Sequence, residues 1–276
     1  MHTDVDRLSV EELRNSRAAW WSAEFDDFLS SAVDHVLPGR LLDVGCGIGT
    51  FEHRFGPRSP SGTAIVGTDI DTRRLGVAAG QAMVLGSGVS ISYVTADARL
   101  LPFADETFKV AMVILTLQHV AHPATVLSEM RRVTKPGGVV AAVEADNLAQ
   151  RLYFPFPSPD VDTALAAYWG RIGESSQPAN IAIGPRLPEL FRMAGLASPE
   201  LKTHMVARAS WIDPKAFANK ARASFQQIAR RHGIGRTVEC EALIAAIGRI
   251  GSSDQERFYA ISTVPLFLVS ASVLAA

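Results

Sequence analysis

The spacing of apolar and polar residues changes near residue 40 of the chain. Before that point, apolar side chains recur at mostly helical intervals, at Ala19, Trp20, Ala23, Phe28, Ala32, Val33 and Val36. Ser9 precedes them, with Glu12 three residues later, which is the arrangement of a helix capping box. Pro38 and Gly39 then break the helical spacing. The pattern predicts helices over residues 8–36.

Beyond Arg40, short apolar runs alternate with helical stretches. The predicted strands are Leu41–Val44, Ala64–Thr68, Ser90–Thr95, Val110–Leu115 and Val139–Val143. Helices are predicted between most of them, at Thr50–Phe55, Arg73–Leu85 and Pro123–Val133. Continuous apolar strands separated by helices are typical of a parallel sheet that is covered on both faces. We therefore predict a doubly wound, Rossmann-like α/β fold that binds its ligand at the carboxyl ends of the strands.

This alternation stops after Asp146. Residues 147–183 are rich in aromatics and prolines, which indicates a loop-and-helix insertion, and a further helix is predicted at Pro185–Ala194. The last two predicted strands lie at 201–210 and 259–273. Two helices are predicted between them, within 214–250. The expected fold is a mostly parallel seven-stranded sheet with N-terminal helices and a helical lid.

The chain therefore has four expected parts. They are an N-terminal helical cover at 1–39, a ligand-binding core at 40–146, an insertion or lid with a helix at 147–195, and the last two strands with their helical insertion at 196–276. A chain of 276 residues is long enough to bury a large core without disulfide bonds.

Composition and charge exclude several classes of protein. Hydrophobic residues make up 47% and charged residues 20% of the chain, which is too apolar for a disordered protein. The formal net charge is -1, from 27 basic and 28 acidic residues, and it argues against broad electrostatic binding of nucleic acid. A local basic cluster at Arg230, Arg231, His232 and Arg236 could hold an acidic ligand or RNA, but a solvated helix end is the favoured interpretation.

The cysteines and the apolar runs indicate where in the cell the protein is expected. Cys46 and Cys240 form neither a disulfide framework nor a metal-ligand cluster, so we expect no metal and a reducing, cytoplasmic location. The polar segment Met1–Glu12 lacks the pattern of a signal peptide. The apolar run Val264–Ala276 is shorter than the roughly 20 residues of a membrane helix, so we expect no membrane span.

A glycine-rich turn follows the first predicted strand. Asp43-Val44 runs into Gly45, Gly47 and Gly49 and then into a helix. Glycines let a ligand approach the backbone closely, and the helix start beyond them has free N–H groups. Asp69 lies 20 residues after Gly49, at the end of the second strand, where a carboxylate can accept two ribose hydroxyls. The alternative is a tight strand–helix turn that binds nothing.

Asp43 distinguishes between nucleotide ligands. Its carboxylate precedes the glycine turn by two residues. A carboxylate beside the pyrophosphate of NAD would be unfavourable, whereas one beside an ammonium or sulfonium group would be favourable. The residues therefore favour a cationic nucleoside, and an NAD-dependent oxidoreductase is the least favoured reading.

These segments together resemble the class I S-adenosylmethionine (SAM)-dependent methyltransferases. Leu41–Thr50 is similar to the first motif of that family, and Ile65–Asp71 to the second. Thr95–Ala98, with Leu101-Pro102-Phe103 and Phe108 after it, is similar to the third. Leu115–His119 matches the end of the fourth strand, and Val133–Gly138 matches the turn before the fifth. The resemblance covers about residues 40–146 and is greatest to the ubiquinone/menaquinone-biosynthesis-type branch, which acts mainly on small molecules.

The resemblance implies a cofactor site. It places Asp69 on the ribose, Asp97 near the adenine amino group and Ala98 at a backbone contact. The implied cofactor-binding residues are Asp43, Gly45, Cys46, Gly47, Gly49, Asp69, Ile70, Asp97, Ala98 and Leu115. The cofactor is SAM and its product is S-adenosylhomocysteine. Lys109 stands where the family usually has an aspartate, a position that is usually structural.

Methyl transfer from a sulfonium is an in-line displacement that needs alignment more than a metal. Hydroxyl and carbon-acid substrates can still need a general base. The candidates are His119, Glu144 and Asp146, each of which could instead have a structural role. His122 precedes Pro123 and is interpreted as a helix cap.

Aromatic residues of the insertion are candidates for an apolar substrate pocket. They are Tyr153, Phe154, Tyr168 and Trp169, which could equally pack the insertion onto the sheet. The fourth strand ends in Leu115-Thr116-Leu117-Gln118-His119. It lacks the Asn/Asp-Pro-Pro-aromatic tetrad that orients planar amines, so adenine and glutamine-amide methylation are disfavoured.

The expected function is methyl transfer from SAM to an oxygen or carbon atom of a small, apolar metabolite. One alternative is an RNA or protein methyltransferase, which would need a basic face around Arg222, Arg230, Arg231 and Arg236. Another is a SAM-binding cyclase or isomerase that methylates nothing, because a fold alone does not fix the reaction. The expected partner is a small molecule, nucleic acid is disfavoured, and a homodimer is left open.

Overall fold

The structure is a computed structural model that describes residues 9–81, 88–156, 158–174, 180–252 and 257–274. The chain forms two compact units. We call the first the sheet unit; its described residues fall within 9–144, 184–204 and 267–274. We call the second the helical unit; its described residues fall within 145–183 and 205–266.

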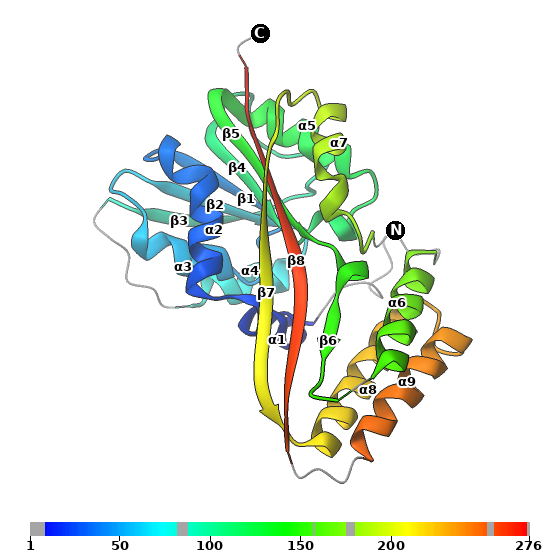
Figure 1. The fold of residues 1–276 in the computed structure, drawn as a ribbon. Helices are drawn as coiled ribbons and strands as arrows, with labels where there is room; N and C mark the ends of the chain where they lie inside the picture. The colour runs from blue at the N-terminus through cyan, green and yellow to red at the C-terminus, as the bar shows by residue number, and fades with distance from the viewer. Residues whose placement is uncertain (1–8, 82–87, 157, 175–179, 253–256, 275–276) are drawn as a thin grey trace. The chain divides into compact units, whose positions relative to one another are not determined.

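Five parallel strands form the centre of the sheet unit (Figure 1). They are β1 (Arg40–Val44), β2 (Ala64–Asp69), β3 (Ser90–Thr95), β4 (Phe108–Ile114) and β5 (Thr134–Ala145). Their order is β3-β2-β1-β4-β5, and Leu42 of β1 lies in register with Val66 of β2 and Ala111 of β4. The predicted doubly wound, Rossmann-like fold is confirmed.

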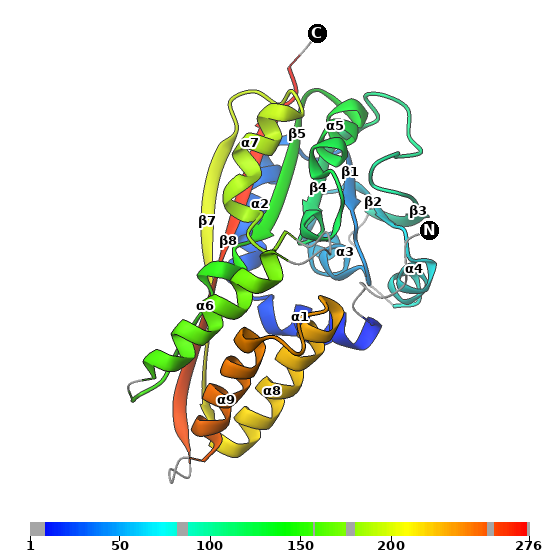
Figure 2. The same cartoon turned by 90° about the vertical axis from the view of Figure 1, so that its right-hand side faces the viewer.

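Helices cover both faces of this sheet. They are α1 (Val10–Trp20), α2 (Ala23–Val33), α3 (Thr50–Phe55), α4 (Thr72–Ala79), α5 (Pro123–Val133) and α7 (Leu187–Met193). Figures 1 and 2 show α5 and α7 side by side on one face, with α2 and α3 on the other. The predicted capping box begins α1: Ser9 N donates to Glu12 Oε2 at 2.7 Å, and Glu12 N donates to Ser9 Oγ at 3.2 Å. The helix expected over 73–85 is α4 at its start, and residues 82–87 lie outside the described part.

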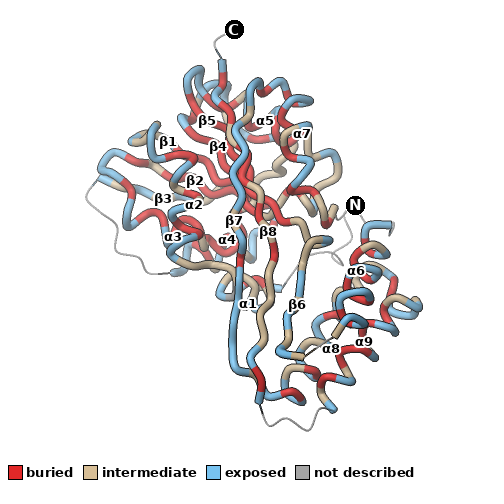
Figure 3. The backbone as a smooth tube through the Cα atoms, in the orientation of Figure 1, coloured by how far each residue is buried: buried red, intermediate tan, exposed pale blue. Residues whose placement is uncertain are grey.

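The core of the sheet unit lies along β1, β4 and β5. Figure 3 shows these strands buried along most of their length. All five residues of Val110–Ile114 are buried, because a central parallel strand is covered from both sides. This is why these strands are continuous apolar runs in the sequence.

The helical unit contains a separate hydrophobic core. Its helices are α6 (Pro159–Gly173), α8 (Pro214–Arg231) and α9 (Val238–Gly251). Buried residues from all three make one cluster, among them Tyr168, Phe225 and Leu243. The predicted break between the last two helices is present, and Gly233 adopts a left-handed conformation there (φ 68°).

Three further strands complete the sheet. They are β6 (Arg151–Tyr153), β7 (Glu200–Ile212) and β8 (Phe258–Ser272). β8 is hydrogen-bonded to β5, β6 and β7. The described sheet thus has eight strands and not the expected seven, because β6 adds one. β6 is only three residues long, so it shows no periodicity in the sequence, and its antiparallel pairing with β8 creates it.

No helix in the described ranges is long and apolar enough to cross a membrane.

Candidate functional site

The glycine turn of the sheet unit is a tight loop between β1 and α3. Gly45, Gly47 and Gly49 all have positive φ, at 76°, 59° and 76°, a region that side chains with a Cβ rarely adopt. The N–H groups of Gly45 and Cys46 both donate to the carbonyl of Thr68, at 2.7 and 2.8 Å. These bonds hold the loop against the end of β2, and the three glycines make that path possible.

Thr116 supports the loop from the end of β4, a contact that sequence reasoning missed. Its Oγ1 donates to the carbonyl of Gly45 at 3.2 Å. A Cβ at Gly45 would lie 2.6 Å from Thr116 Oγ1, which leaves no room for a side chain. The loop backbone and β4 therefore approach each other closely.

Asp69 is held in place by the backbone at the end of β2. Its Oδ2 accepts from Gly47 N at 3.0 Å, and its Oδ1 accepts from Asp71 N at 2.9 Å. A carboxylate has about four acceptor positions, so these bonds leave it able to accept further donors. Ile70, the next residue along, is exposed. The carboxylate is thus oriented before any ligand arrives.

Asp43 is a buried carboxylate at the end of β1. Its Oδ1 has no hydrogen-bond partner among the described residues. Burial raises the pKa of Asp43 to about 7, while the positive charge of Arg17 acts in the opposite direction. An unsatisfied buried oxygen of this kind is costly unless a donor or a cation reaches it.

Helix α1 lies directly over the glycine loop. A Cβ at Gly47 would lie 2.9 Å from Leu13 Cδ2. A cavity of about 10 Å³ remains between α1 and the loop. It is lined by Arg17, Trp21, Asp43, Gly45, Cys46, Thr50, Phe51 and Ile114. Arg17, which sequence reasoning missed, lies on the side of this cavity that α1 forms.

Glu144 ties the end of β5 to the turn after β4. The residue is buried, and its Oε1 accepts from Thr116 N at 2.7 Å and from Leu117 N at 2.5 Å. Burial raises the pKa of Glu144 to about 8, and the backbone donors act in the opposite direction. Its Oε2 has no hydrogen-bond partner within the described part of the chain.

The other two candidate bases lie at turns. His119 is exposed at the end of the short 3-10 helix Leu117–His119. Asp146 accepts from Leu148 N and Ala149 N and so caps the turn that follows it. A catalytic role for His119, Glu144 or Asp146 stays a prediction.

The adenine end of the predicted cofactor site lies after β3. Asp97 forms a two-pronged ion pair with Arg99, with Nε–Oδ1 at 3.0 Å and Nη2–Oδ2 at 2.7 Å. Ala98, between them, is half-buried. Leu115 follows β4 in a left-handed conformation (φ 52°) and its N–H donates to Val143 O at 2.8 Å. Strained backbone of this kind is common at ligand sites.

A second buried carboxyl group lies beneath the loop, and sequence reasoning missed it. Glu52 of α3 is buried, and neither of its oxygens has a hydrogen-bond partner among the described residues. Burial raises the pKa of Glu52 well above its usual value, and the charge of Asp43 raises it further. Burial also raises the pKa of the Cys46 thiol, so this cysteine is protonated near neutral pH. The sequence feature that could have identified Glu52 is a charged residue on the apolar side of α3.

The raised pKa of Glu52 predicts how its substitution changes stability with pH. In the unfolded chain this carboxyl ionises near 4.5, whereas the folded protein keeps it protonated to higher pH. Unfolding above pH 4.5 therefore releases a proton, and stability falls as pH rises, by up to about 1.4 kcal/mol per pH unit. Glu52→Gln is neutral at every pH. Urea denaturation should show the variant gaining stability relative to wild type from pH 5 to pH 8.

Glu129→Gln is the matched control for that prediction. The hydrogen bond from Arg132 lowers the pKa of Glu129. The Glu129 carboxylate therefore stabilises the folded protein above about pH 4.5, and this stabilisation is lost as the pH falls below that value. The prediction would be contradicted if the stability of Glu52→Gln changed between pH 5 and pH 8 by the same amount as that of wild type.

The predicted substrate-binding aromatics lie in the helical unit. Tyr168 is buried and its hydroxyl donates to Phe225 O at 2.7 Å, and Trp169 Nε1 donates to Gln150 Oε1 at 3.0 Å. Both belong to the hydrophobic cluster, and Phe154 packs against it. Tyr153 is exposed. Their role in substrate binding stays a prediction.

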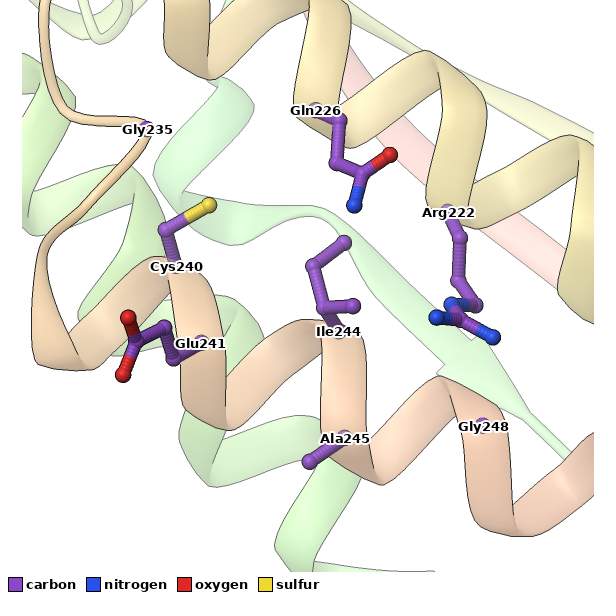
Figure 4. Close-up of a pocket in the computed structure, with 8 residues that line it drawn as sticks. All are labelled: Arg222, Gln226, Gly235, Cys240, Glu241, Ile244, Ala245 and Gly248. Carbon is purple, nitrogen blue, oxygen red and sulfur yellow. The ribbon is translucent and has the colours of Figure 1, made fainter.

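An open cavity of about 360 Å³ lies between α8 and α9 of the helical unit (Figure 4). Arg222, Gln226, Cys240 and Ile244 line it with four others. Burial raises the pKa of Cys240, so its thiol is protonated near neutral pH and is a poor nucleophile.

Comparison with known families adds to this geometry. The family described as "Methyltransferase domain" matches residues 42–142, which include the glycine loop, Asp69, Asp97 and Thr116. Residues 42–142 are thus similar to a methyltransferase domain. The core of this region has a Rossmann-like arrangement of parallel strands.

Curated proteins with methyltransferase names are also similar to this chain. A ubiquinone/menaquinone biosynthesis C-methyltransferase of Burkholderia orbicola is 36% identical over 111 residues, which is 40% of this chain and 45% of that protein. A ubiquinone biosynthesis O-methyltransferase of Hahella chejuensis is 34% identical over 148 residues, which is 49% of this chain and 59% of that protein. The chain thus spans about half the length of the curated relatives it matches.

A solved structure has a similar fold. It is phosphoethanolamine N-methyltransferase 2 of Haemonchus contortus in complex with SAM, with a TM-score of 0.52 and 14% identity. The alignment covers 92% of this chain and 53% of that one.

Proposed function

We propose that this protein is a SAM-dependent methyltransferase that acts on an oxygen or carbon atom of a small, apolar metabolite. The observation that carries the proposal is the buried carboxyl of Asp43, whose Oδ1 has no hydrogen-bond partner among the described residues, beside a glycine loop with no room for side chains. The domain family and the C- and O-methyltransferases among the curated relatives support it.

The residues of the loop fit SAM better than NAD. A sulfonium or ammonium group near Asp43 would supply the positive charge that its buried oxygen lacks, whereas a pyrophosphate there would be repelled. Asp69 is already oriented by Gly47 N and Asp71 N and would accept the ribose hydroxyls. Asp97 and Ala98 would hold the adenine. When bound, SAM supplies a methyl group already activated on a positively charged sulfur.

In this proposal α1 has to move before SAM enters. The cavity of about 10 Å³ at Asp43 holds no more than one water molecule. Arg17 brings a positive charge that faces Asp43 and Glu144, the same sign of charge that a sulfonium would bring. We infer that α1 covers the loop when SAM is absent and shifts when SAM binds.

The protein's contribution to the reaction is alignment and removal of a proton. An O- or C-nucleophile becomes reactive when a base takes its proton. Glu144 is one candidate, because a pKa of about 8 lies close to neutral pH and its Oε2 is unpartnered. His119 and Asp146 are the others. The accepting atom and the base form the finer part of this proposal.

Calorimetry with SAM and with NAD tests the proposal. We expect wild type to bind SAM with a Kd on the order of micromolar and to give no heat with NAD. Asp43→Asn should weaken SAM binding at least about tenfold, because it removes the charge that faces the sulfonium. Asp105→Asn is the matched control, since Asp105 pairs with Arg132 at the surface. Absence of SAM heat, or an Asp43→Asn variant that binds SAM like wild type, would sink the proposal.

The transfer itself needs a second measurement. Wild type with methyl-labelled SAM and a panel of phenols, quinols and enolisable ketones should give S-adenosylhomocysteine and a product heavier by one CH2 group. Conversion of a panel member at unchanged mass and without consumption of SAM would instead identify a cyclase or isomerase.

A further inference from the structure

The helical unit has a small sheet with one covered face and one open face. It consists of β6, residues 205–212 of β7 and residues 258–266 of β8. Phe258 belongs to the hydrophobic cluster formed by α6, α8 and α9, and Leu152, Ile212 and Ala260 pack against it. These residues therefore define the covered face.

The residues next to them along each strand point the other way. Successive side chains of a strand lie on opposite faces, so Tyr153, Trp211, Tyr259 and Ile261 lie opposite the helices. Tyr153 is in register with Ile261 across β6 and β8. The rings of Trp211 and Tyr259 are in contact, with centroids 5.5 Å apart. We call the surface made by these four residues and Met205 the open face.

The open face is exposed, and an arginine lies at the end of each of two of its strands. Trp211 is 65%, Met205 54%, Tyr153 53% and Tyr259 43% exposed. Arg151 lies on this face two residues before Tyr153, and its Nη1 donates to the carbonyls of Leu148 and Gln150. Arg257, which is exposed, lies two residues before Tyr259. Large apolar patches on a surface mark interaction sites. Trp, Tyr and Met, with few charges, are the composition of the centre of a protein interface.

We infer that the open face is the interface between two copies of this chain. An aromatic side chain presents about 150–250 Å², so with these exposures the open face offers on the order of 500 Å² per chain. Two copies would bury ~1,000 Å², the lower bound for a specific interface. The centre of the open face is apolar, so the face can pair with itself around a two-fold axis while its two arginines stay at the rim. Binding to an anionic membrane would instead favour a cluster of about four to eight basic residues, more than the two arginines at the ends of the open face.

Sedimentation equilibrium of the full chain tests the inference. We expect wild type to show twice the chain mass at tens of micromolar and to dissociate on dilution. Trp211→Glu and Tyr153→Glu, on different strands, should each raise the dimer dissociation constant at least about 100-fold, because each places a charge in a dry contact. Val238→Glu is the matched control, because Val238 is 78% exposed in the same unit but away from the open face.

The possible results distinguish a dimer interface from a monomeric protein and from a membrane-binding face. Melting temperatures equal to that of wild type, measured at a concentration where all the proteins are monomeric, would show that the variants fold. A wild type that stays monomeric at every concentration, or a dimer that neither variant weakens, overturns the inference. Co-sedimentation of the monomer with phosphatidylglycerol vesicles, lost in Trp211→Glu, would also overturn it and assign the open face to a membrane. None of these results depends on whether SAM binds.

Discussion

Replacing Asp69 with alanine is expected to weaken SAM binding by at least about 100-fold. The carboxylate would accept two ribose hydroxyls, and hydrogen bonds to charged groups contribute about 1.5–3 kcal/mol each. The change also removes the acceptor that positions Gly47 N, at 3.0 Å, and so loosens the glycine loop itself. Isothermal titration calorimetry with SAM measures the loss.

Two variants distinguish a lost ligand contact from a lost fold. Asp71→Ala removes a neighbouring buried carboxylate that caps α4 and pairs with Arg73. It should cost about 1 kcal/mol of stability and leave SAM affinity near wild type. Asp69→Asn keeps an acceptor but loses the charge and should fall between wild type and Asp69→Ala. An Asp69→Ala protein that melts normally and binds SAM at full affinity would refute the ribose assignment.

Gly67→Ala is expected to destabilise the protein by about 3 kcal/mol or more. Gly67 lies in the middle of β2, and a Cβ there would stand 2.8 Å from Tyr93 Cδ1 and 2.9 Å from Cys46 Sγ, with Glu52 Oε1 nearer still. Overpacking a well-filled core costs about 1–3 kcal/mol and sometimes more. Here all three neighbours are held between the sheet and α3, so the strain has little room to relax. Urea denaturation measures the change.

The double variant Gly67→Ala/Glu52→Ala tests the cause of that loss. Removing the Glu52 carboxyl vacates the space nearest the new methyl group, so the second substitution should restore part of the stability. Gly76→Ala is the control, because a Cβ at Gly76 on α4 meets nothing within 4 Å. It should stabilise the protein by about 0.5–1 kcal/mol through helix propensity. Strictly additive effects of Gly67→Ala and Glu52→Ala would show that the clash lies elsewhere.

The sequence was sufficient for the fold of residues 40–146 because its signals there are local. Val110–Ile114 is a continuous apolar run since both faces of β4 are covered, and Gly45, Gly47 and Gly49 mark a turn that other residues cannot make. Hydrophobic periodicity and backbone conformation depend on residues that are close in the chain, so both can be inferred from the sequence. β6 was missed for the same reason, because its three residues pair with a strand more than 100 positions away and carry no pattern of their own.

The contacts of the candidate site depend on residues that are distant in sequence. Thr116 supports Gly45, Glu144 holds the turn that contains Thr116, and Glu52 lies against Gly67. Each contact joins the ends of different strands or a helix to a strand. No local pattern indicates which side chains meet there, and a single sequence shows Glu52 only as one charged residue on a short helix.

The sequence by itself determined the strand–helix alternation, the glycine loop and the acidic residues at the ends of β1, β2 and β3, because each depends on backbone preferences and spacing. Only the tertiary structure decided how those groups are charged and covered. Burial raises the pKa of Asp43 and Glu144 to about 7 and about 8, and α1 lies over the loop with Arg17 facing the carboxylates. Desolvation depends on every atom packed around a group, so it exists only once the chain has folded.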